Sequence, residues 1–240
     1  MTRNMSKNID INTIANRLLT AHDNINMESE NSGRNPNDVK LMAVSKTKPD
    51  NLIIAAYENG QRIFGENYAQ ELSDKSKRLS ALKGIEWHYI GPIQSNKTKL
   101  ICEASQWVDS IDRAKIATRL NQHCEEFEKT LNVLIQVNVS NSENKSGVTL
   151  NDVSELAQHI SGLPLLTLRG LMAIPDKYDN AETTKQEFLA MRTCFYELKQ
   201  QYPEVDTLSL GMSGDLPLAI ECGSTMVRIG TAIFGEREAK

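Results

Sequence analysis

Short apolar runs rich in β-branched residues alternate with longer amphipathic stretches through most of the chain. The short runs predict β-strands, and the longer stretches, in which apolar residues recur every three or four positions, predict α-helices. The predicted strands are 39–45, 61–64, 85–90, 106–110, 131–139, 165–173, 206–211 and 226–230. The predicted helices between them include 50–59, 68–82, 112–129, 151–160 and 181–201. This pattern is typical of an α/β protein built from strand–helix units.

Eight strands in 240 residues leave about 30 residues for each unit, which is the length of a βα repeat. We therefore expect a closed (β/α)8 TIM barrel with an extra N-terminal helix at 8–30. The alternative, an open doubly wound sheet, needs a glycine-rich turn after its first strand, but positions 45–49 contain no glycine. No repeat or linker divides the chain, so a single domain over residues 1–240 is predicted.

Composition narrows the possible partners. A hydrophobic content of 40% and a charged content of 24% are typical of a soluble globular protein, and a net charge of −4 argues against nucleic-acid binding. No apolar run approaches the roughly 20 residues of a membrane span, and the polar N-terminus lacks the apolar stretch typical of a signal peptide. The four cysteines and four histidines are dispersed, which predicts reduced thiols, no metal site and a cytoplasmic location.

Chemistry in a barrel lies where strands end, so the strand exits are the candidate positions. Lys46 follows the first strand, and an amine delivered there can lose part of its solvation, so that its pKa falls and it can condense with an aldehyde. The alternative is a strand-end lysine with its ammonium group in water. Lys48 shares strand parity with Lys46 but precedes Pro49, which places it at the mouth of the barrel.

The last two strand exits indicate an anion site. The loop at 211–215 opens a helix, so its backbone N–H groups and the Ser213 hydroxyl can face a phosphate. Gly230 admits a close backbone approach, and Thr231 adds a hydroxyl donor. The alternative is that these glycines only make tight turns.

Three further residues have both a binding and a structural interpretation. Arg228 lies two positions before Gly230 on the same strand face, and it can donate either to a ligand acceptor or to a carboxylate such as Glu66. His88 at the third exit is either a ligand-facing group or a packed, hydrogen-bonded histidine. Asn67 at the second exit is either a ligand-facing amide or the N-cap of the following helix.

These residues lie in motifs that resemble the pyridoxal phosphate homeostasis protein family in order from about residue 10 to 237. The motifs are Val44-Ser45-Lys46-Thr47-Lys48, Phe64-Gly65-Glu66-Asn67, His88-Tyr89-Ile90-Gly91, Gln94-Ser95-Asn96-Lys97, Arg169-Gly170-Leu171-Met172-Ala173-Ile174-Pro175, Gly211-Met212-Ser213 and Arg228-Ile229-Gly230-Thr231-Ala232-Ile233-Phe234-Gly235. The resemblance implies a barrel related to the N-terminal domain of alanine racemase, fold type III of the proteins that use pyridoxal 5'-phosphate (PLP).

The resemblance also implies the roles of individual residues. Lys46 would be the Schiff-base lysine that carries PLP as an aldimine. Ser213, Gly230 and Thr231 would hold the phosphate, with Met212 beside them, and Arg228 would face the pyridine nitrogen. Asn67 and His88 would line the ring pocket, and Lys48 and Lys145 are secondary candidates. The alternative for Lys145 is a solvated loop lysine. Gly214 is a minor departure, because an acidic residue is frequent there.

We expect PLP binding without robust catalysis. An arginine opposite the pyridine nitrogen keeps that nitrogen an acceptor and weakens the ring as an electron sink. Racemases of this fold type supply a second base from an added β domain, and only six residues follow Phe234. The expected function is therefore PLP (vitamin B6) and amino-acid homeostasis by a monomer, with PLP-dependent apoenzymes as recipients and no catalytic residue. The alternatives are a PLP-dependent amino-acid racemase and a phosphosugar-binding barrel.

Overall fold

Eight parallel strands close into a barrel in the order of the sequence, within residues 11–176 and 180–236, which the computed structural model describes. They are β1 (Lys40–Val44), β2 (Ile63–Glu66), β3 (Glu86–Tyr89), β4 (Trp107–Ile111), β5 (Leu131–Val137), β6 (Leu166–Ala173), β7 (Thr207–Ser209) and β8 (Met226–Ile229). Strand β8 pairs with β1, with Met42 opposite Arg228 and Ala43 opposite Ile229, and this pairing closes the ring. The predicted barrel is confirmed.

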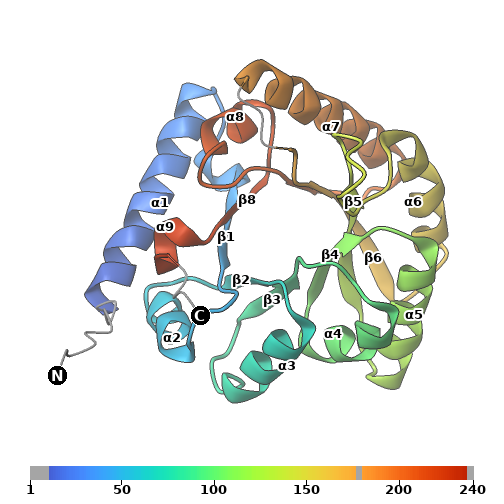
Figure 1. Cartoon of the computed structure of the whole chain (residues 1–240), viewed down its shortest axis with the longest axis horizontal. Coiled ribbons are helices and arrows are strands. Elements are labelled where there is room, and N and C mark those ends of the chain that lie inside the picture. Colours follow the sequence, from blue (N-terminus) through green and yellow to red (C-terminus); the bar gives the residue numbers. More distant parts are fainter. Residues whose placement is uncertain (1–10, 177–179, 237–240) are drawn as a thin grey trace.

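Helices surround the strands on the outside, as Figure 1 shows. They are α2 (Asp50–Glu58), α3 (Ala69–Arg78), α4 (Thr98–Ala104), α5 (Ala114–Glu126), α6 (Val153–Ser161), α7 (Ala181–Gln201), α8 (Leu216–Glu221) and α9 (Thr231–Phe234). The predicted extra helix is α1 (Ile11–Asn31), which packs against α2, α8 and α9. Short 3-10 turns lie at Pro36–Asp38, Ser95–Lys97 and Leu150–Asp152. Helix α1 thus covers the side of the barrel where the first and last strands meet.

Alternation along each strand divides the buried residues between two layers. In β8, Val227 and Ile229 belong to the large core between the strands and the helices, so Arg228 between them points into the barrel. Trp107, Leu134 and Met172 form a separate cluster that fills the barrel interior. Side chains therefore fill the barrel interior, and a ligand site can lie only at the strand ends.

The element boundaries differ from the predictions mainly at short segments. Helix α3 begins at Ala69 and ends at Arg78 instead of spanning 68–82, and β7 covers only Thr207–Ser209 of the predicted 206–211. Helix α4 was not predicted, because seven residues are too few to display a helical period. Positions 8–10 of the predicted N-terminal helix lie outside the described residues.

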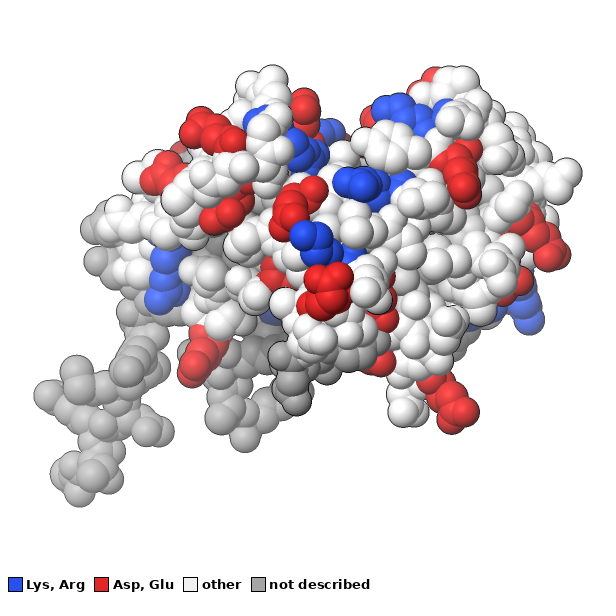
Figure 2. Space-filling model, turned by 90° about the horizontal axis from the view of Figure 1, so that it is seen from above, with Lys and Arg blue, Asp and Glu red and all other residues white. Residues whose placement is uncertain are grey.

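The described surface carries both signs of charge. On the face shown in Figure 2, lysine and arginine are interspersed with aspartate and glutamate. No helix among the described residues has both the length and the apolar character required to cross a membrane. In the same part of the chain, no cluster of three or more histidine, cysteine, aspartate or glutamate side chains is arranged to hold a metal ion.

Candidate functional site

The closing pair of strands brings the Lys46 and Thr231 segments together. Because Ala43 lies opposite Ile229 in the β1–β8 ladder, the two strands end side by side. A Cβ atom added to Gly230 would lie 3.2 Å from the carbonyl oxygen of Val44, so only glycine fits without a shift. Thr231 follows at the exposed start of α9. An amine and a hydroxyl group are thus delivered to one edge of the barrel mouth.

Lys46 lies in a tight turn directly after β1. The backbone N–H of Lys48 donates to the Ser45 carbonyl over 3.0 Å, which closes the turn over Lys46 and Thr47. Thr47 has a φ of +63°, as the third residue of a type II turn does, although this position normally requires glycine or asparagine. Lys46 is half-buried as a residue, and the shielding of its amine from bulk water stays a prediction.

Arg228 is a buried guanidinium held by neutral oxygens in the described part of the chain. It donates to the Ser209 carbonyl and hydroxyl over 2.8 and 2.7 Å and to the Ala173 carbonyl over 2.9 Å. Burial lowers its pKa to about 10, so the group stays charged at neutral pH. The alternative of an ion pair with Glu66 is wrong, because Glu66 lies on the outer face of the barrel and pairs with Lys75 over 2.8 Å.

The loop between β7 and α8 lies beside Arg228. The backbone N–H of Arg228 donates to the Gly211 carbonyl over 3.0 Å. Met212 donates its N–H to Asp215 Oδ1 over 2.5 Å, and this contact holds the loop in a turn. Met212 and Ser213 are exposed, and Ser213 also lines a cavity of about 360 Å³ bounded by α1, α8 and α9. Ser213 is therefore accessible from solvent.

Asn67 follows β2 at the neighbouring exit. A Cβ atom on Gly91 would lie 2.0 Å from the Asn67 carbonyl oxygen, so the loops after β2 and β3 touch. The N-cap of α3 is Tyr68, with no capping side chain, and the alternative of Asn67 as N-cap is wrong. Asn67 is half-buried and lies beside the exit of β1, because Val44 at the end of β1 pairs with Gly65 in β2.

His88 lies inside the barrel with partners on both ring nitrogens. Its Nδ1 is 3.0 Å from both carboxylate oxygens of Asp109, and its Nε2 is 3.4 Å from Glu86. The ring stacks on Trp107 with centroids 4.9 Å apart. Burial acts to lower the His88 pKa, but Asp109 and Glu86 outweigh it and the pKa is raised. The packed, hydrogen-bonded interpretation of His88 is confirmed, and its contact with a cofactor ring stays a prediction.

The two secondary lysines lie on different sides of the barrel. Lys48 donates to the carbonyls of Gly235 and Glu236 over 2.9 and 2.6 Å, next to the Lys46 turn. Lys145 follows β5, forms an ion pair of 2.6 Å with Asp176 and donates to the Ile174 carbonyl. It is therefore not a simple solvated loop lysine. Because β5 is four strands from β1 in the ring, Lys145 lies across the mouth from Lys46.

Three residues that form hydrogen bonds to the site residues or to their backbone were not predicted from the sequence. Ser209 anchors Arg228, Asp109 holds His88, and Lys75 contacts the backbone of the Lys46 turn. One signal was present for Lys75: it lies three residues after Leu72 and four before Leu79, on the buried face of α3. A charged residue at such a position must find partners in the interior.

Comparison with known proteins first defines the class of barrel. Residues 20–238 match the family model described as the alanine racemase N-terminal domain. Alanine racemase from Corynebacterium glutamicum superposes with a TM-score of 0.69 over 96% of this chain and 62% of its own, and at 16% identity this likeness shows the fold alone. The protein is a barrel of the alanine racemase N-terminal type.

Similar proteins at higher identity define the family. PipY of Synechococcus elongatus, in a structure with PLP bound, has a TM-score of 0.80 and 35% identity over 92% of this chain and all of that one. The pyridoxal phosphate homeostasis protein of Pasteurella multocida is 50% identical over 230 residues, 94% of this chain and 98% of its own length. That of Vibrio alginolyticus is 54% identical over 217 residues, 89% of this chain and 93% of its own length. The chain belongs to the pyridoxal phosphate homeostasis protein family.

Proposed function

We propose that this protein binds PLP at the β1–β8 edge of the barrel mouth and acts in intracellular PLP and amino-acid homeostasis. The observation that carries the proposal is the placement of the Lys46 turn beside Gly230 and Thr231, whose exits are joined by the ladder that closes the barrel. When bound, PLP supplies an aldehyde that reacts reversibly with a primary amine. Lys46 supplies that amine.

The donors at the site fit such a ligand. The hydroxyls of Ser213 and Thr231 are exposed at the last two exits, and Gly230 leaves its backbone open to close approach. Arg228 has only donors, and its partners in the described chain are neutral oxygens, so an acceptor in front of it would complete the site. Met212, Asn67 and His88 complete the proposed lining, and Lys48 and Lys145 are proposed secondary positions.

The proposal includes storage and transfer of the cofactor without robust turnover of amino acids. Arg228 supports this part, because a permanent donor opposite a ring nitrogen keeps that nitrogen unprotonated. The single-domain organisation, the monomeric state, the cytoplasmic location and the PLP-dependent apoenzymes as recipients belong to the same proposal. Recipients are tested by the rate at which loaded protein, compared with an equal amount of free PLP, reactivates a cofactor-free PLP enzyme.

The central test is the site of covalent attachment. Protein incubated with PLP is reduced with borohydride, digested and mapped by mass spectrometry, with Lys46→Arg and Lys48→Arg as matched variants. We expect the adduct on Lys46 and its loss in Lys46→Arg alone. An adduct confined to Lys48 or Lys145 would refute the assignment. Rapid interconversion of D- and L-amino acids, abolished in Lys46→Ala, would instead establish the racemase.

A further inference from the structure

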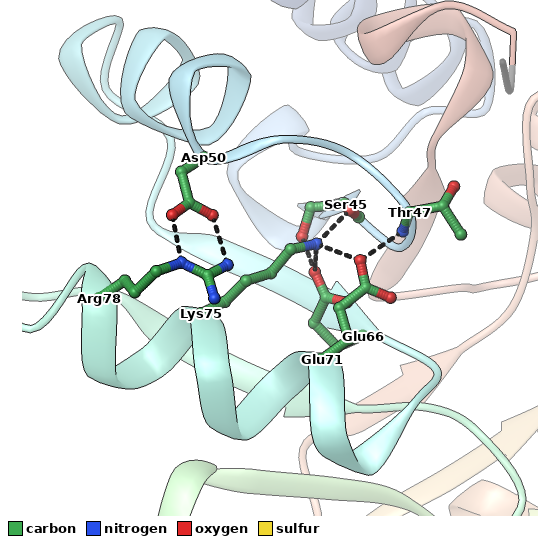
Figure 3. A network of polar contacts seen from close by, with 7 residues as sticks. All are labelled: Ser45, Thr47, Asp50, Glu66, Glu71, Lys75 and Arg78. Carbon is green, nitrogen blue, oxygen red and sulfur yellow. Dashed lines mark hydrogen bonds and ion pairs between the residues drawn. The ribbon is translucent and has the colours of Figure 1, made fainter.

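The ammonium group of Lys75 is buried against the turn that carries Lys46 (Figure 3). Only 2% of this side chain is exposed. Its Nζ donates to the Ser45 carbonyl over 2.7 Å, to Glu66 Oε1 over 2.8 Å and to Glu71 Oε1 over 2.7 Å. An ammonium has three N–H donors, so these contacts use its full capacity.

The carboxylates of Glu66 and Glu71 also accept hydrogen bonds from the residues on either side of Lys46. Glu66 Oε1 accepts the Ser45 hydroxyl over 2.5 Å, and Glu71 Oε1 accepts the backbone N–H of Thr47 over 2.6 Å. Ser45 is therefore held through its carbonyl and its hydroxyl, and Thr47 is held through its amide. We call Lys75, Glu66 and Glu71 the turn clamp.

The turn clamp is costly if stability is its only role. Thr47 is β-branched and has a φ of +63°, a conformation that persists only when the surroundings impose it and that clusters at functional sites. Glu66 is fully buried, and its second oxygen has no hydrogen-bond partner among the described residues. Well-packed apolar side chains are often at least as stable as a buried ion pair. The first cost falls on Thr47, which follows Lys46, and the second falls on Glu66, which contacts Ser45, the residue before Lys46.

A second ion pair on the same helix provides a contrast. Arg78 donates to both oxygens of Asp50 over 2.6 and 2.9 Å, and this pair also joins α3 to the segment after β1 (Figure 3). Arg78 is exposed and Asp50 is partly exposed, and Asp50 lies at the start of α2 rather than in the turn. Arg78 can therefore report the effect of losing an α3 ion pair without losing the turn clamp.

We propose that Lys75, Glu66 and Glu71 are positioning residues for Lys46. These three residues hold the 45–48 turn in its strained form and so present the Lys46 amine in one orientation. They act through Ser45 and Thr47. The inference rests on the proposed function for the identity of the ligand, while the clamp itself is defined by contacts of the protein alone.

The test uses the full chain with Glu71→Ala, Glu71→Gln, Lys75→Met and, as the matched control, Arg78→Met. The first readout is hydrogen exchange of the Thr47 amide in cofactor-free protein. We expect exchange to accelerate about tenfold in Glu71→Ala, because the acceptor of this amide is lost. Arg78→Met is expected to exchange as the wild type does. Glu71→Gln keeps an acceptor oxygen and is expected to restore most of the protection.

The second readout is the reactivity of the Lys46 amine, measured by acetylation of cofactor-free protein and mass spectrometry. We expect Glu71→Ala and Lys75→Met to change the Lys46 acetylation rate severalfold and to weaken PLP binding about tenfold or more. Arg78→Met is expected to change neither. Glu71 is partly exposed, so Glu71→Ala keeps the test valid even where Lys75→Met fails to fold.

Two different failures can be told apart. If Thr47 exchange and Lys46 acetylation in Glu71→Ala match the wild type, the turn clamp is refuted while PLP binding to the wild type stands. If the wild type does not attach PLP to Lys46, the proposed function is refuted, and the two cofactor-free readouts still decide whether the clamp orders the turn. Equal losses in Arg78→Met and Glu71→Ala would also refute the positioning role.

Discussion

The backbone N–H of Thr47 donates to the Glu71 side chain over 2.6 Å, and Thr47 holds a φ of +63°. A residue of helix α3 thus contacts the residue that follows Lys46, and the contact coincides with a backbone conformation that threonine avoids. A strained residue held by a side-chain partner is a way to hold a neighbouring side chain in one place.

The strain at Thr47 predicts an unusual order of stability between two variants. Thr47→Gly and Thr47→Ala both lose the threonine side chain, but only alanine keeps the Cβ that penalises a positive φ. We expect Thr47→Gly to be more stable than Thr47→Ala by about 1 kcal/mol, the reverse of the usual order. Urea unfolding of both variants measures this, and equal or inverted stabilities would show that the turn carries no strain.

The close approach of Gly230 to Val44 predicts a steric defect on substitution. In Gly230→Ala the new Cβ would lie 3.2 Å from the Val44 carbonyl oxygen, so this carbonyl must shift by a few tenths of an ångström where the Lys46 turn begins. We expect a loss of about 1 to 3 kcal/mol in the free energy of unfolding, together with weaker PLP binding.

Gly214→Ala is the control for this change, because a Cβ at Gly214 meets no atom within 4 Å. Its stability is expected to stay within about 0.5 kcal/mol of the wild type. Urea unfolding and titration with PLP measure both variants. Equal behaviour of Gly230→Ala and Gly214→Ala would contradict a special requirement at 230.

Burial of Glu66 predicts a pH dependence of stability. Desolvation raises the Glu66 pKa from 4.5 to about 7, although Lys75 and Ser45 act to lower it and Glu71 adds to the rise. The folded state therefore binds this proton more tightly than the unfolded state, so the contribution is full below pH 4.5 and is lost as the pH rises to about 7. Unfolding of the wild type between pH 4.5 and 8 should show stability falling across this window.

Glu66→Gln removes the titrating group and is expected to flatten that part of the profile. Glu103→Gln, at an exposed ion pair with Lys77, is the matched control and should keep the wild-type slope. His88 also has a raised pKa and contributes in the same direction, so the difference between the Glu66→Gln and wild-type profiles is the decisive quantity. A profile unchanged by Glu66→Gln would show that Glu66 is ionised throughout.

The His88 and Asp109 pair predicts a large effect from one neutralised carboxylate. Asp109→Asn removes the charge that raises the His88 pKa, and both side chains are fully buried. We expect a loss of about 3 kcal/mol in stability and a lower His88 pKa by NMR titration. Glu86→Gln, at the longer and more exposed contact of 3.4 Å, should cost less than about 1 kcal/mol. Similar costs for the two variants would contradict the assignment of Asp109 as the main partner of His88.

The sequence alone was sufficient for the long elements of the fold. Helix α7 spans Ala181–Gln201, as its periodicity predicts, and β6 spans Leu166–Ala173 of the predicted 165–173. Local pattern suffices here because each element repeats its period several times. Helix α4 and strand β7 were missed or misjudged because three to seven residues carry too little of a period.

The sequence also determined which residues lie at the barrel mouth, because the carboxyl ends of all strands in a parallel barrel lie on the same side. The positions of Lys46, Asn67, Ser213 and Thr231 at the strand exits therefore follow from the sequence. Only the tertiary structure decided what surrounds them: that Arg228 donates to Ser209 and Ala173 rather than to Glu66, and that Lys75 reaches the Lys46 turn. These partners come from elements far apart in the sequence, and the packing of the closed barrel, which no local pattern encodes, sets which of them meet.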